Sequence, residues 1–181
     1  QRLWFLDQLE PGTAAYNLSW TVRLRGDLDT RALRRAWQQL VDRHESLRTV
    51  FPDAGGVPEQ RVLDSLTPDV GFHDLRGAFD EQVRAELQVL AGRSFDLAKG
   101  PLHELVLLRL GEREHMLLVV VHHIVADGAS MRILFRELAA CYEAELSGEP
   151  ADLPPLPVQY VDFAVWQRSW LDGAELARQT H

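Results

Sequence analysis

The chain has few cysteines, no long apolar run and no excess of positive charge, and each absence narrows what it can do. Cys141 is the only cysteine among 181 residues, which excludes an intrachain disulfide and a cysteine-based metal cluster. Cys141 falls within an expected helix, and we interpret it as a small buried apolar side chain rather than a nucleophile.

Membrane and nucleic-acid functions are disfavoured on the same grounds. No apolar stretch approaches the roughly 20 residues that a membrane-spanning helix needs. Asp7 and Glu10 interrupt the apolar start, which argues against a secretory signal. The 19 Lys and Arg residues are outnumbered by 27 Asp and Glu residues, giving a formal net charge of −8, whereas phosphate binding needs clustered cations. We therefore expect a cytoplasmic protein that binds neither nucleic acid nor membrane.

What is present predicts a globular α/β domain. The composition, 46% hydrophobic and 25% charged, is that of an ordinary folded domain, and the length suffices for one core. Helical and strand patterns alternate along the chain, and a segment with four prolines, 149–157, is a connector. Strands are expected at 17–25, 47–51, 60–63, 102–110 and 114–122, and helices at 29–44, 79–91 and 130–146 and from about 158.

The most informative stretch is HHIVADG, residues 122–128, which follows the apolar run 116–121. That run predicts a buried strand, so two imidazoles, a carboxylate and a glycine leave the strand end together. Imidazole has the side-chain pKa nearest neutrality and suits proton transfer. Because side chains alternate along a strand, His122 and His123 are expected on opposite faces, which disfavours their binding one metal.

The HHxxxDG spacing resembles the active-site motif of the condensation domains of non-ribosomal peptide synthetases, members of the chloramphenicol acetyltransferase-like superfamily. Other segments resemble further motifs of that family in the same order. They are QRLWFL (1–6), the end of a first motif; RHESLRTVF (43–51), a second; FDLAKGPL (95–102); and YVDFAVW (160–166), a fourth.

The resemblance implies a fold. Residues 1–181 would form the N-terminal lobe of a condensation domain, a chloramphenicol acetyltransferase-like α+β sandwich whose mixed sheet has helices packed on it. This lobe would be half of a two-lobed, V-shaped domain with its active site in a tunnel between the lobes. The start of the first motif and the whole C-terminal lobe would be missing, so we expect the isolated lobe to be inactive.

The resemblance also implies an activity. A donor aminoacyl or peptidyl thioester would be joined by an amide bond to an acceptor aminoacyl thioester. Both substrates would be held on phosphopantetheine arms of donor and acceptor carrier proteins, beside an adenylation domain of the same synthetase. The domain itself would bind no cofactor and no metal.

Site residues follow from the resemblance one by one. His123 would contact the amino group of the acceptor, as a general base or as a positioning group. His122 would be structural and set the turn. Asp127 would form a salt bridge with Arg43 or Arg48, although a turn or a helix N-cap are alternatives for it. Gly128 would bring the backbone close to the substrate or supply a positive φ.

Other functions of this scaffold stay open at this point. They are an epimerisation domain, an ester-forming acyltransferase, and a non-catalytic platform that recruits carrier proteins. The 43–51 segment favours condensation, and the retained His123 argues against a degenerate platform. Tyr160, Asp162 and Trp166 are interpreted as structural, in an aromatic-rich helix that packs on the lobe.

Overall fold

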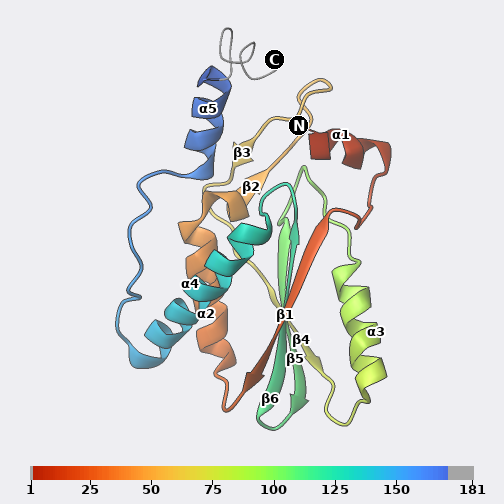
Figure 1. Cartoon of the computed structure of the whole chain (residues 1–181), viewed down its shortest axis with the longest axis vertical. Helices are drawn as coiled ribbons and strands as arrows, with labels where there is room; N and C mark the ends of the chain where they lie inside the picture. Colours follow the sequence, from red (N-terminus) through yellow and green to blue (C-terminus); the bar gives the residue numbers. More distant parts are fainter. Residues whose placement is uncertain (1, 171–181) are drawn as a thin grey trace.

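A four-stranded mixed sheet forms the centre of the computed structural model, which describes residues 2–170; Gln1 of the first motif lies outside them. The strand order is β1-β6-β5-β4, with β6 antiparallel to both neighbours and β4 parallel to β5 (Figure 1). The strands are β1 (Asn17–Arg25), β4 (Val70–Asp74), β5 (His103–Gly111) and β6 (Glu114–His122), with β2 (Thr49–Val50) and β3 (Arg61–Val62) in a separate ribbon.

Helices cover both faces of this sheet, as the predicted α/β arrangement requires. Helices α2 and α4 lie on one face and α3 lies on the other (Figure 1). None of the helices in residues 2–170 combines the length and apolarity needed to cross a bilayer. The helices are α1 (Arg2–Leu9), α2 (Thr30–Arg43), α3 (Asp80–Ala91), α4 (Gly128–Ser147) and α5 (Tyr160–Trp170), with a 3-10 helix η1 (Glu45–Arg48).

Strand β6 is buried on both faces, which explains its continuous apolar sequence. Val119 and Val121 belong to the core cluster shared with α2 and α4. Leu118 and Val120 belong to the cluster on the α3 side. A strand covered on both faces loses the alternation of apolar and polar residues seen in half-exposed strands. The site loop therefore leaves from the most enclosed strand of the sheet.

Most predicted elements are confirmed, and the caps explain their starts. Strand β1 has the predicted bounds, and β5 and β6 form the predicted hairpin. Asp29 caps α2 by accepting bonds from the backbone nitrogens of Arg31 and Ala32, at 2.8 and 3.0 Å. Helix α4 begins at Gly128, earlier than predicted, because Asp127 caps it.

Other expectations need correction. Most of the predicted 47–51 strand is the 3-10 helix η1 and a two-residue strand. The sequence patterns did not predict α1 or β4. Helix α5 is present, but none of its residues, 160–170, is buried, so the predicted packing of Trp166 on the lobe is wrong. The Trp166 side chain is 53% exposed.

Candidate active site

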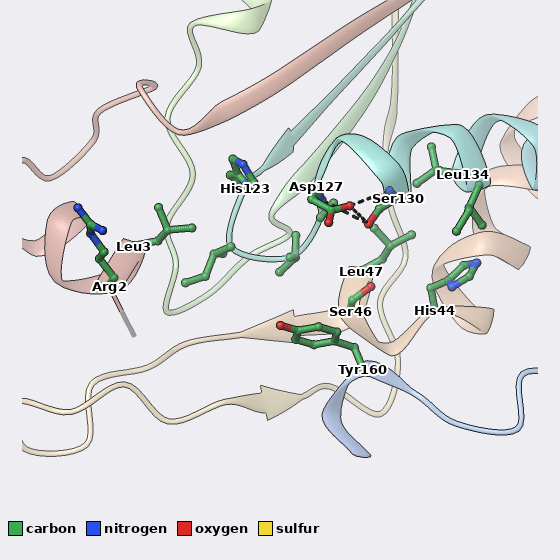
Figure 2. A pocket seen from close by; sticks show the side chains of 14 residues that line it. Arg2, Leu3, His44, Ser46, Leu47, His123, Asp127, Ser130, Leu134 and Tyr160 are labelled. Atoms are coloured by element: carbon green, nitrogen blue, oxygen red, sulfur yellow. Dashed lines mark hydrogen bonds between the residues drawn. The ribbon is translucent and has the colours of Figure 1, made fainter. Parts of the chain in front are cut away.

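A pocket of about 550 Å³ opens where β6 ends and α4 begins. Segments far apart in the sequence meet around it: the start of α1, the η1 region, the 123–127 loop, α4 and the first residue of α5 (Figure 2). Its apolar lining includes Leu47, Val125 and Leu134, and its polar lining includes His123, Asp127 and Tyr160. Such an apolar pocket with a few convergent polar groups is the usual form of a small-molecule site.

The two histidines of the motif lie on opposite sides, as strand alternation predicts. The His122 side chain is buried, with the rings of Tyr16 and Phe95 edge-on to it at centroid distances of 6.3 and 6.5 Å. The His123 side chain is exposed and lines the pocket. Only the second imidazole is therefore available to a molecule in the pocket.

The buried His122 shapes the turn that presents His123. The backbone nitrogen of Ile124 donates a hydrogen bond to Nδ1 of His122 at 3.2 Å. Burial, with a smaller contribution from the neighbouring charge of His123, lowers the pKa of His122 to about 4. His122 is thus neutral at pH 7 and accepts the bond that fixes the loop. This contact agrees with the expected role of His122 in setting the turn, which stays a prediction.

The backbone of His123 is anchored, and the residue lines the pocket. Its nitrogen donates to the carbonyl oxygen of Tyr16 at 2.8 Å, and the nitrogen of Val125 donates to the carbonyl of His122 at 3.1 Å. Within residues 2–170, no hydrogen bond or ion pair engages the His123 imidazole, which Figure 2 shows at the loop that borders the pocket. An anchored backbone with an unengaged imidazole suits a residue that binds a substrate group.

Asp127 does not form the predicted salt bridge with Arg43 or Arg48. Its Oδ1 accepts bonds from the backbone nitrogen and the Oγ of Ser130, at 2.8 and 2.6 Å. These bonds lower the pKa of Asp127, with a smaller contribution from the charge of His123. The helix N-cap, the alternative interpretation of this residue, is the observed one, because α4 starts immediately after Asp127.

Arg43 points instead to a buried carboxylate. Its Nε donates to Oε2 of Glu137 at 3.0 Å, and Nε2 of His44 lies 2.7 Å from the same oxygen. The Glu137 side chain is 3% exposed, and burial alone would raise its pKa. The bonds from His44 and Arg43 outweigh burial and lower the pKa of Glu137. The Arg43 guanidinium is thereby paired with the buried Glu137 rather than with Asp127.

The Arg48 guanidinium is hydrogen-bonded to backbone carbonyl groups. It donates to the carbonyl oxygens of Val41, at 3.2 Å, and of Leu63. These bonds join the end of α2 to the chain that follows β3. The predicted Asp127 partner is therefore wrong for this arginine as well, although both arginines do support the segments behind the pocket.

The backbone of Gly128 contradicts one of its two predicted roles, a positive φ, whereas close approach of the backbone to a substrate stays a prediction. It does not have a positive φ, and a Cβ built on it would meet no atom within 4 Å. It occupies the first position of α4. In the described structure another small residue would fit there.

The sequence interpretation overlooked two residues that matter here. Glu137 has the same spacing as the buried Leu134, Leu138 and Cys141, so a carboxylate on the apolar face of a helix was the available signal. Tyr160, interpreted as structural, lines the pocket. Across residues 2–170, no group of three or more His, Cys, Asp or Glu side chains is arranged to hold a metal ion.

Comparison with known proteins places this geometry in context. The condensation-domain family model matches residues 1–181. Phosphinothricin tripeptide synthetase PhsC of Streptomyces viridochromogenes is 48% identical over 179 residues, which are 97% of this chain but 16% of that protein. This chain therefore spans a small part of that curated relative.

Solved structures agree with the family match. The X-domain in its complex with OxyB from teicoplanin biosynthesis has a TM-score of 0.86 at 36% identity, over 96% of this chain and 37% of that one. The starter condensation domain of rhizomide synthetase also has a TM-score of 0.86, at 22% identity, over 98% of this chain and 43% of that one. The second likeness concerns the fold alone.

Proposed function

This chain belongs to the condensation-domain family, with its chloramphenicol acetyltransferase-like fold, and we propose that it serves to form amide bonds in non-ribosomal peptide synthesis. The donor is an aminoacyl or peptidyl thioester and the acceptor an aminoacyl thioester. Donor and acceptor carrier proteins present them on phosphopantetheine arms, with an adenylation domain in the same synthetase. A cytoplasmic location stays a prediction of the sequence.

The observation that carries this proposal is the different placement of the His122 and His123 imidazoles. The buried imidazole holds the turn, and the exposed one borders the pocket. In the reaction, the acceptor nitrogen attacks the carbonyl carbon of the donor thioester, a C–N bond forms and the C–S bond breaks. The leaving thiolate takes up one proton, and the amine loses one. His123 holds the amine or transfers that proton.

We further propose that residues 1–181 form the N-terminal of two lobes. The pocket is open in this chain, and the chain covers 37% and 43% of the two solved relatives described above. A second lobe facing the pocket would exclude water from the thioester and complete the tunnel. The domain needs no cofactor of its own, because the carrier arms bring both reacting groups.

The test is amide formation by the two-lobed domain with loaded donor and acceptor carrier proteins, read by intact-protein mass spectrometry. His123→Ala should lower the rate by about 10²–10⁴-fold. His123→Gln distinguishes the two roles, since glutamine can hold an amine but cannot accept its proton. Arg132→Ala, an exposed change on α4 outside the pocket, is the matched control.

A recruitment platform is the second candidate, because the X-domain relative is solved in complex with OxyB. Carrier binding without any product from wild type would favour that function. Loss of configuration at Cα of a carrier-bound residue, without amide formation, would favour epimerisation. An ester product from a hydroxyl acceptor would favour an ester-forming acyltransferase.

A further inference from the structure

Helix α5 reaches the pocket through its first residue, although no residue in 160–170 is buried. Polar contacts just before the helix hold it in place. Oε1 of Gln159 accepts a bond from the backbone nitrogen of Glu45 at 3.2 Å, and Nε2 donates to the carbonyl oxygen of Arg43 at 3.0 Å. A single side-chain amide thus joins the start of α5 to the end of α2.

Arg43, to whose carbonyl oxygen Gln159 is hydrogen-bonded, is itself fixed by contacts of its side chain. Arg43 is bound through its side chain to the buried carboxylate of Glu137 and donates a further bond to the carbonyl oxygen of Pro154. The 149–157 connector and the start of α5 are therefore both fastened to a residue that the α4 core fixes. Movement of Gln159 would require breaking bonds to this anchored segment.

Tyr160 follows Gln159 directly and lies on the other side of the pocket from the His123 loop (Figure 2). Its side chain is 59% exposed, and among residues 2–170 no hydrogen bond engages its hydroxyl. The ring of Phe163 lies beside it at a centroid distance of 6.1 Å. The phenol hydroxyl is therefore available to a polar group in the pocket, and the ring offers an apolar surface beside it.

We propose that Tyr160 contacts the carrier-bound substrate in the His123 pocket and that Gln159 is the positioning residue that holds it there. This inference rests on the proposed amide-forming function. The phenol hydroxyl donates a hydrogen bond to a carbonyl oxygen of the aminoacyl or peptidyl group, and the ring covers its apolar side chain. Tyr160 thereby binds and orients an acyl group without taking part in proton transfer.

The test uses the two-lobed domain with loaded carrier proteins. Tyr160→Phe removes only the hydroxyl and should raise KM about fivefold with kcat unchanged, as expected for loss of one substrate hydrogen bond. Tyr160→Ala also removes the ring and should raise KM further. Val165→Ala, a 65% exposed change on α5 outside the pocket, is the matched control and should leave KM unchanged.

Gln159 is tested by a double-mutant cycle. If it acts through Tyr160, Gln159→Ala should raise KM in the wild-type background and have little further effect in Tyr160→Ala. Equal effects in both backgrounds would overturn the positioning role. The midpoint of thermal unfolding is measured for every variant. If Gln159→Ala is unstable, substrate contact by Tyr160 is judged from Tyr160→Phe.

The outcomes separate this inference from the function on which it rests. Wild-type amide formation that His123→Ala abolishes, together with raised KM in the Tyr160 variants, supports both. The same wild-type activity with unchanged KM in Tyr160→Phe and Tyr160→Ala overturns the role of Tyr160 alone. Failure of the wild type to form any amide overturns the proposed function, and this inference with it.

Discussion

Helices α4 and α5 both border the His123 pocket, but α4 is built into the core whereas α5 is attached to it. The inward face of α4 buries Met131, Leu134, Leu138 and Cys141 beside Glu137. No residue of α5, 160–170, is buried, and Gln159 holds its start by hydrogen bonds. One wall of the pocket thus depends on packing and the other on a few polar contacts.

Because of this difference, substitutions on α4 and on α5 should affect different properties, the stability of the lobe and the binding of substrate respectively. Changes on the inward face of α4 should destabilise the whole lobe, because its side chains fill the core next to α2. Changes on α5 should alter the pocket while leaving the lobe folded. The site loop, residues 123–127, belongs to the first wall, so the His123 imidazole is presented by the stable part of the molecule.

The largest expected effect on stability is at Glu137. Glu137→Ala should lower the free energy of unfolding by about 3–5 kcal/mol, because it leaves Arg43 partly buried without its carboxylate partner. Glu143→Ala, an exposed change on the same helix, should stay within about 0.5 kcal/mol of wild type. Urea denaturation measures both, and equal effects of the two variants would contradict the buried role of Glu137.

The next largest effect is expected from acidification, which should lower the free energy of unfolding. Burial lowers the pKa of His103 and of His122 to about 4 in the folded chain, whereas histidine in an unfolded chain has a pKa of about 6.5. The unfolded chain therefore binds more protons between these values, so the free energy of unfolding falls as pH drops from about 6.5 to about 4 and is flat above.

The expected loss over that interval is a few kcal/mol. Denaturation curves at a series of pH values measure it. A His103→Asn variant should show a shallower slope, since one of the two titrating imidazoles is gone. A slope equal to that of wild type would show that His103 does not resist protonation in the folded chain.

A smaller effect is expected at the start of α4. Asp127→Ala should lower the free energy of unfolding by about 1 kcal/mol, because it removes the N-cap bond to Ser130. Asp127→Ser can still cap the helix and should recover most of this loss. Thermal unfolding compares the two, and similar destabilisation by Ser and Ala would mean that capping is not the contribution of Asp127.

The smallest effect is expected on α5. Trp166→Ala should change the free energy of unfolding of residues 1–181 by about 0.5 kcal/mol, since the ring is 53% exposed and stacks on Trp170 at 5.5 Å. Leu138→Ala on α4, at a side chain 4% exposed, should cost about 2–5 kcal/mol. Comparable losses in a denaturation experiment would remove the distinction between the two walls.

The sequence by itself determined the local features of this protein. Alternation with a period of two placed His122 and His123 on opposite faces, and the apolar run before them predicted β6. The cap at Asp29 and the β5–β6 hairpin were also predictable, because caps and hairpins depend on residues close together in the chain. The short β4 was missed because five residues containing a glycine carry little periodic signal.

Only the tertiary structure decided which side chains meet. By charge, Arg43 and Arg48 were equally plausible partners for Asp127, yet in the folded chain Arg43 pairs with Glu137, 94 residues away, and Asp127 bonds to Ser130. Tyr160 reaches the pocket because Gln159 attaches α5 to the end of α2. The Arg43–Glu137 and Gln159–Arg43 contacts join elements remote in sequence, and they depend on how helices pack on the sheet, which no local pattern of residues specifies.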